Sequence, residues 1–349
     1  MILERQPAAF NGQRQTPPLL EVRGLSKRFP IGGWFSRSQV HALEGASFTL
    51  DRGRVTALVG ESGSGKSTTA RLVARLIEPT AGEIVLNGRD VLKSEPRSAS
   101  LGYRADVQMI FQDPFASLNP VHTVGYHLER PLYVHTKARG AAERREQIAS
   151  LLAVVGLIPP AEFVDKFPHE LSGGQRQRVA FARALAVDPA VMLADEPISM
   201  LDVSIRMGIL NLMDRLKQER GIAYLYITHD IASARYVADE TIVMYAGRMV
   251  EGADGDDLIR QPAHPYTQLL LSAVPDPRAR RIRQVRARAE APSLIDPPPG
   301  CPFAPRCPRV MDVCRQTMPG VEMIAPRHWV RCHLYGSGEV LTRSDLVTV

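Results

Sequence analysis

Residues 60–67 read Gly60-Glu61-Ser62-Gly63-Ser64-Gly65-Lys66-Ser67 and match the pattern G-x-x-x-x-G-K-[ST] at every fixed position. An apolar run over residues 55–59 precedes this segment, and Thr68 opens a helical pattern over residues 68–77. The glycines let the backbone curl, so that successive amide hydrogens and the positive helix end point at one anion. A glycine-rich turn without function is the alternative, and the flanking strand and helix disfavour it. The sequence therefore predicts a phosphate-binding loop.

Two acids at the end of a second apolar run extend this prediction. Residues 191–196 have the sequence V-M-L-A-D-E, in which Asp195 and Glu196 follow four apolar residues. Acids at strand ends are common, but next to a phosphate loop they acquire separate roles. We expect Lys66 to reach the β- and γ-phosphates of ATP, Ser67 and Asp195 to hold Mg²⁺, and Glu196 to polarise an attacking water.

A further glycine pair precedes a helical pattern over residues 176–187. The segment is Leu171-Ser172-Gly173-Gly174-Gln175. Ser172 is a favourable helix cap, and the glycines leave backbone amides open to an anion. A plain capped helix is the alternative interpretation. A second phosphate-binding helix start in a chain that already has one calls for a functional explanation.

Together these segments resemble the ABC family of ATPases. In that family the segment at Ser172, Gly173, Gly174 and Gln175 closes over the ATP of an opposite subunit, so the resemblance implies a dimer. It also implies a magnesium ligand at Gln112, a D-loop at Asp202 and a catalytic histidine at His229, which contacts the γ-phosphate. Phe29 stands where the family stacks an aromatic ring on adenine. A core phenylalanine at a strand end is the alternative for Phe29.

Other segments resemble the oligopeptide and dipeptide importers within this family. They are Asp113-Pro114-Phe115-Ala116-Ser117-Leu118-Asn119, Pro168-His169-Glu170, His264-Pro265-Tyr266-Thr267 and the cysteine-bearing tail. The resemblance covers about residues 20–333. It implies ATP-driven peptide import with a second, related ATPase subunit, two transmembrane permeases and an extracytoplasmic substrate-binding protein. Phe115 and Leu118 would then fill a permease cleft, with packing inside the chain as the alternative. Another solute, such as an oligosaccharide or metal complex, and a non-transport ABC ATPase remain alternatives.

We expect an α/β fold: a P-loop cassette with a mixed sheet, an antiparallel β subdomain and a helical subdomain. Residues 1–18 form a flexible N-terminal segment, and residues 19–271 form the cassette with its helical part at 113–188. An arginine- and proline-rich linker follows at 272–299, and a small cysteine-containing region occupies 300–349. No internal repeat is present, which predicts one nucleotide cassette per chain.

Charge and hydropathy narrow the location. The formal charge is +6, and six arginines lie between positions 278 and 288. No interleaved aromatic residues or known binding module accompany them, so we expect no nucleic-acid partner and favour a linker near anionic lipid headgroups. No run approaches the roughly 20 apolar residues of a membrane helix, and the N-terminal residues do not resemble a signal peptide. The sequence predicts a peripheral protein on the cytoplasmic face of the inner membrane.

Four cysteines lie in the last fifth of the chain, spaced C-x₅-C-x₆-C-x₁₇-C among prolines. They are Cys301, Cys307, Cys314 and Cys332. Structural disulfides are rare in a reducing cytosol. Four thiolates suit either a [4Fe-4S] cluster or a zinc ion, and the gaps of five and six exceed those typical of zinc ribbons. The resemblance to peptide-importer ATPases also favours the cluster, in a structural role. Zinc and free or disulfide-bonded thiols remain the alternatives.

Overall fold

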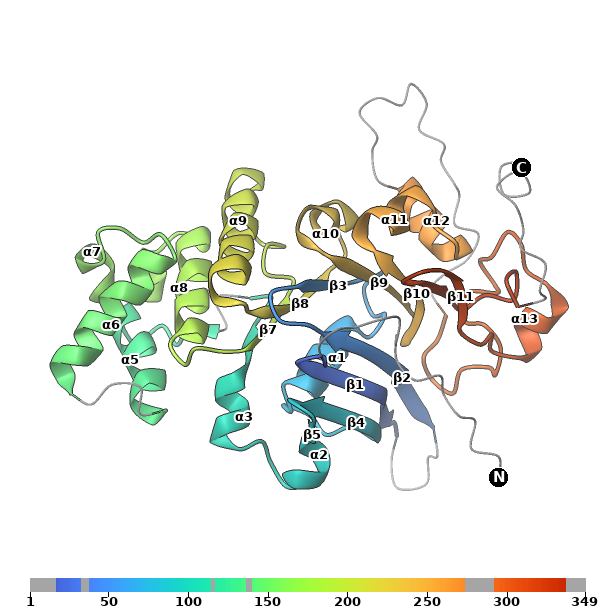
Figure 1. Ribbon diagram of the computed structural model, residues 1–349, viewed down its shortest axis with the longest axis horizontal. Coiled ribbons are helices and arrows are strands. Elements are labelled where there is room, and N and C mark those ends of the chain that lie inside the picture. Colours follow the sequence, from blue (N-terminus) through green and yellow to red (C-terminus); the bar gives the residue numbers. More distant parts are fainter. Residues whose placement is uncertain (1–16, 33–37, 114–116, 136–139, 274–291, 337–349) are drawn as a thin grey trace.

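The computed structural model describes residues 17–32, 38–113, 117–135, 140–273 and 292–336. These residues form two sheets and a set of helices around them (Figure 1). The larger sheet has eight strands in the order β11-β12-β10-β9-β3-β8-β7-β6, and the smaller one has four in the order β2-β1-β4-β5. The prediction of an α/β cassette with an added antiparallel sheet is confirmed.

The large sheet is parallel on one side and antiparallel on the other. Strands β6 (Val107–Ile110), β7 (Val191–Asp195), β8 (Ala223–Thr228), β3 (Val55–Val59) and β9 (Glu240–Tyr245) pair in parallel. β3, β7 and β8 are buried along their whole length, as expected for parallel strands covered on both faces. The carboxyl ends of β3 and β7, where both predicted phosphate-site segments begin, therefore lie at the same edge of the sheet.

The small sheet is entirely antiparallel. It comprises β1 (Leu20–Pro30), β2 (Gln39–Leu50), β4 (Ala81–Leu86) and β5 (Arg89–Asp90). Two short helices, α2 (Val91–Ser94) and α3 (Leu101–Asp106), lead from it back to β6. α1 (Lys66–Val73) packs between the sheets, against β2, β7 and β8.

Helices gather at the β6 end of the large sheet and lie at one end of the molecule (Figure 1). They are α5 (Val124–Val134), α6 (Ala141–Val154), α7 (Ala161–Val164), the 3₁₀ turn η1 (Pro168–Glu170) and α8 (Gly173–Leu185). α9 (Val203–Arg220) packs against α8, and α10 (Ile231–Val237) packs on β3 and β8. α11 (Gly255–Arg260) and α12 (Pro265–Ser272) follow β10 (Arg248–Asp254).

The cysteine-bearing region continues the large sheet at its opposite end (Figure 1). Helix α13 (Asp312–Gln316) precedes β11 (Glu322–Ala325) and β12 (His328–Val330), and β12 pairs with β10. Part of the predicted linker is also attached to the small sheet, because Ile295 forms an antiparallel β-bridge with Val40 on β2. The arginine run between 278 and 288 lies outside the described residues.

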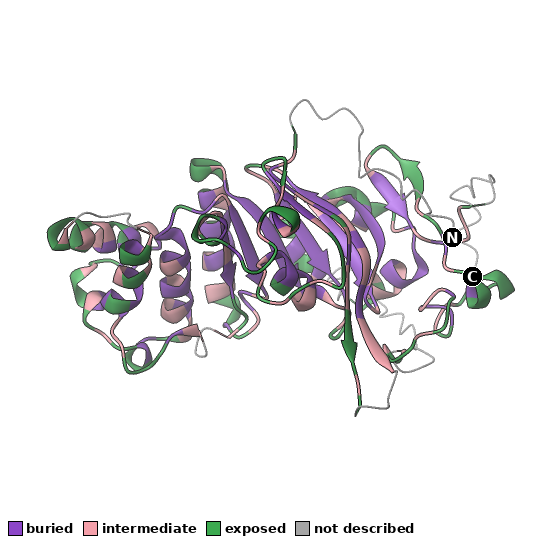
Figure 2. Cartoon of the chain, turned by 90° about the horizontal axis from the view of Figure 1, so that it is seen from below, coloured by how far each residue is buried: buried purple, intermediate pink, exposed green. Residues whose placement is uncertain are grey.

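Two hydrophobic clusters hold these parts together, and buried residues run through the middle of the molecule (Figure 2). Phe303 belongs to one cluster, together with Val59 and Tyr245. Trp329 belongs to the other, together with Leu58 and Met244. The cysteine-bearing region thus contributes a fully buried ring to one core and a nearly buried one to the other.

The predicted elements agree with the observed ones to within a few residues where the apolar pattern is strong. β3 has the predicted bounds, and the helix predicted from residue 176 begins three residues earlier, at Gly173. The strands that were not predicted are β4, β5, β6, β9, β10, β11 and β12. Within the described ranges, no helix is long and apolar enough to cross a membrane.

Candidate nucleotide site

The phosphate loop connects β3 to α1, and its glycines occupy positions that a side chain would obstruct. A Cβ atom at Gly60 would lie 2.2 Å from the carbonyl oxygen of Met244, and one at Gly65 would lie 2.6 Å from that of Ala42. Gly65 has a φ of 100° and precedes the helix without a side-chain cap. The amides at the start of α1 therefore have no capping side chain and are available to an anion.

Lys66 folds back over the loop in this structure. Its Nζ donates to the carbonyl oxygens of Gly60, at 2.7 Å, and Glu61, at 2.8 Å, and lies 3.4 Å from the Ser64 hydroxyl. Burial lowers the pKa of Lys66, and the nearby carboxylates of Glu196, Asp195 and Glu61 oppose this shift. A buried ammonium held by neutral carbonyls gains more from phosphate oxygens, which carry full negative charge.

Ser67 and Asp195 meet beside the loop. The Ser67 hydroxyl donates to Asp195 Oδ1 at 2.9 Å. Burial raises the pKa of Asp195, and the hydrogen bond from Ser67 opposes that rise. A hydroxyl and a carboxylate side by side form an oxygen donor set that suits Mg²⁺.

Glu196 is the point where three predicted residues meet. Its carboxylate accepts a hydrogen bond from Gln112 Nε2 at 3.0 Å and lies 3.0 Å from His229 Nδ1. Its backbone has a φ of 45°, a left-handed conformation that a non-glycine residue seldom adopts. Gln112 follows β6 and His229 follows β8, so neighbouring strand ends place all three side chains at one edge of the sheet.

The predicted signature segment begins α8 as a complete capping box. Ser172 Oγ accepts from the Gln175 amide at 3.3 Å, and Gln175 Oε1 accepts from the Ser172 amide at 2.9 Å. Gly174 is needed for packing, because a Cβ there would lie 2.5 Å from Ile205. α8 packs with α5, α6 and α9 in the helical part, whereas α1 packs on the sheets (Figure 1).

Two other predicted residues are exposed. Asp202 precedes α9 at the surface, next to Val203, which is 75% exposed. Phe29, at the end of β1, is 38% exposed, so the interpretation of a core phenylalanine is wrong. Leu118 is buried with Val124 in the chain's own core, which supports packing for this residue and not a permease contact. Phe115 lies outside the described residues.

Sequence reasoning missed a set of contacts around Glu61. Its amide donates to the Tyr266 hydroxyl at 2.9 Å, and its carboxylate forms a two-pronged ion pair with Arg306. Tyr266 belongs to the H-P-Y-T segment and Arg306 stands directly before Cys307. Both are members of segments singled out in the sequence, but nothing in their spacing indicates a contact with the loop.

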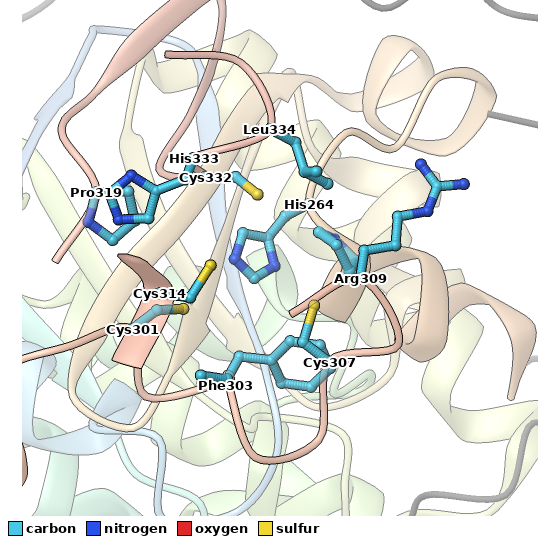
Figure 3. Close-up of a pocket in the computed structure, with 12 residues that line it drawn as sticks. His264, Cys301, Phe303, Cys307, Arg309, Cys314, Pro319, Cys332, His333 and Leu334 are labelled. Carbon is cyan, nitrogen blue, oxygen red and sulfur yellow. The ribbon is translucent and has the colours of Figure 1, made fainter. Parts of the chain in front are cut away.

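The four cysteines surround one small cavity, together with His264 and Phe303 (Figure 3). All four thiols are free. Burial raises the pKa of Cys301 to about 11 and that of Cys332 to about 12, and the other thiols add to both shifts. Among the described residues, however, no group of three or more Cys, His, Asp or Glu side chains is arranged to hold a metal ion.

Comparison with known proteins identifies both parts of the chain. A family model described as ABC transporter matches residues 43–199, and one described as oligopeptide/dipeptide transporter, C-terminal region, matches residues 250–314. The dipeptide transport ATP-binding protein DppF of Haemophilus influenzae is 45% identical, over 92% of this chain and 98% of that protein. DppF of Escherichia coli is 47% identical over 86% and 90%, and the oligopeptide transport ATP-binding protein AppF of Bacillus subtilis is 43% identical over 91% and 97%.

Solved structures agree. The ATP-binding cassette MJ0796, in a dimeric post-hydrolysis state with ADP and Pi, superposes with a TM-score of 0.58 at 30% identity, over 67% of this chain and 98% of that one. The cbiO1 subunit of an ABC transporter complex from Clostridium perfringens gives 0.60 at 27%, over 70% and 91%. The chain therefore belongs to the ABC transporter family of ATP-binding proteins, in the branch that carries the oligopeptide/dipeptide transporter C-terminal region.

Proposed function

We propose that this chain hydrolyses ATP as one half of a two-cassette motor and powers the import of dipeptides or oligopeptides. One observation carries the ATPase part: Gln112 and His229 meet on the Glu196 carboxylate, beside the Ser67–Asp195 pair. The site thus brings together a phosphate loop, an oxygen donor set for Mg²⁺ and a carboxylate held by two neighbours.

Each group has a role that its position supports. Lys66 exchanges the carbonyls of Gly60 and Glu61 for the β- and γ-phosphates of ATP. Ser67 and Asp195, with Gln112, would hold Mg²⁺, which when bound neutralises charge on the phosphates. Glu196 accepts a proton from the attacking water, and His229 orients the γ-phosphate.

The signature segment serves a second subunit. Ser172, Gly173, Gly174 and Gln175 begin a helix of the helical part, whereas Lys66 begins a helix between the two sheets. A dimer would place the start of α8 over the partner's phosphate loop, with Asp202 and the exposed apolar residues Met200 and Val203 at the junction. We propose a related but different ATPase subunit as the partner.

The test of the ATPase role is Glu196→Gln, which keeps the shape and removes the base. We expect ATP binding to persist and turnover in the assembled transporter to fall by about 10²-fold or more. Glu219→Gln, at an exposed position of α9, is the matched control and should hydrolyse ATP at the wild-type rate. Wild-type turnover by Glu196→Gln would reject the assignment.

The peptide cargo is supported by the names of the relatives and by the C-terminal region that the family model describes. We propose two transmembrane permeases and an extracytoplasmic binding protein as further partners, and a place on the cytoplasmic face of the inner membrane. Uptake of a labelled dipeptide by vesicles containing the assembled complex should require ATP and Lys66. Uptake of an oligosaccharide or a metal complex in place of peptides would reject the cargo and keep the motor.

For the cysteines we propose a [4Fe-4S] cluster with a structural role. The support is that Cys301, Cys307, Cys314 and Cys332 line one cavity without disulfides. Burial raises the pKa values of Cys301, Cys307 and Cys332, which keeps these uncomplexed thiols neutral, and a bound metal would supply the positive charge that stabilises thiolates. Among the described residues, no group of three or more such side chains is arranged to hold a metal ion, whether zinc or a cluster, so the proposal rests on the shared cavity and on the resemblance.

Anaerobic purification tests this assignment. We expect iron and acid-labile sulfide in equal amounts, with broad absorbance near roughly 400 nm. Cys307→Ser should lose both and keep measurable ATP binding that depends on Lys66, weaker than that of the wild type, which separates cluster loss from unfolding. Stoichiometric zinc without iron would reject the cluster in favour of a zinc site. Four titratable thiols without any metal would reject both the cluster and the zinc site.

A further inference from the structure

Arg306 forms a contact between the cysteine-bearing region and the phosphate loop. Its Nη1 lies 2.8 Å from Glu61 Oε2 and its Nη2 lies 3.0 Å from Glu61 Oε1, so the guanidinium and the carboxylate form a bidentate ion pair. Nη1 also donates to the Tyr245 hydroxyl at 3.2 Å. Only 8% of the arginine side chain is exposed, against 35% of the Glu61 side chain, so the guanidinium is sheltered and the carboxylate is partly open to solvent.

Three hydrogen-bonding groups of Glu61 are engaged, and together they fix this residue of the phosphate loop. Its amide donates to Tyr266, its carbonyl oxygen accepts from Lys66, and its carboxylate pairs with Arg306. Lys66 is the residue that must leave this carbonyl when phosphate binds. The backbone of Glu61 therefore sets the starting position of the phosphate-binding lysine.

The charge of Glu61 is a second reason for the pair. A carboxylate beside an anion site repels the phosphates of ATP, and Lys66 already senses Glu61 through space. The two-pronged pair with Arg306 offsets the negative charge of that carboxylate. Without the arginine, the Glu61 side chain could move and its negative charge would have no cationic partner.

The other end of Arg306 is held by the turns that carry two of the cysteines. The Ala304 amide donates to the Cys301 carbonyl, the Arg306 amide to that of Phe303, and the Cys307 amide to that of Ala304. Cys301 and Cys307 line the cavity, with Phe303 between them in the sequence (Figure 3). Arg306 thus projects from a short, internally bonded segment that lines the cavity.

We propose that Arg306 is a positioning residue for the phosphate loop and makes its affinity for ATP depend on the cysteine-bearing region. This inference rests on the proposed nucleotide site. The arginine acts through Glu61, the loop residue that it pairs with.

The experiment measures the affinity of the full chain for Mg-ATP by equilibrium titration. Arg306→Ala should weaken it by about 5-fold or more, within the usual range of coupling between sites. Arg306→Lys keeps the charge but not the two-pronged geometry, and its affinity for Mg-ATP should lie between those of the wild type and Arg306→Ala. Arg327→Ala is the matched control: it removes another ion pair between this region and the cassette, to Asp254, and should bind ATP as the wild type does.

A double-substitution cycle separates positioning from general loosening. Glu61→Gln alone should weaken binding less than Arg306→Ala does, because it loses the two-pronged pair but leaves no unpaired carboxylate beside the phosphates, and the combination should bind no more weakly than Arg306→Ala. In the assembled ATPase, Arg306→Ala should raise the KM for ATP and leave kcat unchanged. If Arg306→Ala does not fold, Glu61→Gln carries the test, because it changes no residue of the C-terminal region.

Three outcomes would overturn the inference. They are an unchanged ATP affinity in Arg306→Ala, an equal loss of affinity in Arg327→Ala, and additive effects of Arg306→Ala and Glu61→Gln. Lys66→Ala distinguishes this from failure of the proposed site. Lost binding in Lys66→Ala with normal binding in Arg306→Ala rejects only the role of Arg306. Normal binding in Lys66→Ala rejects the nucleotide site itself.

Discussion

Truncation of Phe303 to alanine should destabilise the whole cassette and not just the region that contains it. Phe303 is fully buried, although it lies among loops two residues after Cys301. Its ring packs edge-on against Tyr245 at 5.2 Å between centroids and lies 5.5 Å from Tyr266. Tyr245 ends β9 and Tyr266 belongs to α12, so one side chain connects three parts of the chain.

The expected loss of unfolding free energy is about 3–5 kcal/mol, the usual cost of removing a buried phenylalanine ring. Each of the aromatic pairs adds about 0.5–1.5 kcal/mol beyond the buried area, which favours the upper part of that range. Phe303→Leu refills part of the space and should cost less. Val313→Ala, in the exposed α13 of the same region, should change stability by no more than about 0.5 kcal/mol.

Urea unfolding followed by tryptophan fluorescence and by far-ultraviolet circular dichroism would measure these differences. If the cysteine-bearing region shares the core of the cassette, both signals should change in one coincident transition. Two separate transitions, with Phe303→Ala shifting only one of them, would refute the reasoning. So would a loss of less than about 1 kcal/mol, because that is the cost expected of a surface change.

Three other substitutions test separate parts of the structure. Gly60→Ala places a Cβ against the Met244 carbonyl and should abolish ATP binding. Gly63→Ala meets nothing within 4 Å and has only the backbone strain of its φ of 77°, so it should weaken binding far less in the same titration. Ser172→Ala removes a helix cap worth about 1 kcal/mol and should leave ATP binding by the isolated chain intact while lowering turnover of the assembled ATPase. Glu251 is fully buried, and its carboxylate accepts hydrogen bonds from the Ala263 and His264 amides and from His328. In Glu251→Gln the side-chain NH₂ would face one of these donors and leave it without an acceptor. This substitution should lower the unfolding free energy by about 2–3 kcal/mol in chemical denaturation.

The sequence predicted best what is contiguous. The phosphate loop, the acids after β7 and the cap of α8 are each specified within a few neighbouring residues, where one pattern determines backbone and chemistry together. β6 has only four residues, so its apolar pattern was too short to recognise. Gln112 was found by family resemblance and not through the strand that positions it.

Contacts between distant segments left no trace in the pattern. Glu61 and Arg306 are 245 positions apart, and a single ion pair has no periodicity to reveal it. The spacing of the cysteines indicated a compact centre but not that Phe303 and Trp329 enter the two cores of the cassette. The left-handed backbone of Glu196 was equally hidden, since glutamate is not a residue type that signals this conformation.

The pairing of β12 with β10 has a consequence for synthesis of the chain. His328 reaches Glu251 across 77 positions of sequence, so the ribosome must add that many residues before the edge of β10 can be covered. At about 5–20 residues per second this takes several seconds, during which the nascent domain exposes an unpaired strand edge. Late closure of a long loop is also slow in folding terms, because its entropy is lost before the contacts form. A ribosome stalled before residue 328 should therefore carry a cassette that is bound by chaperones and digested by proteases, and release of the complete chain should end both.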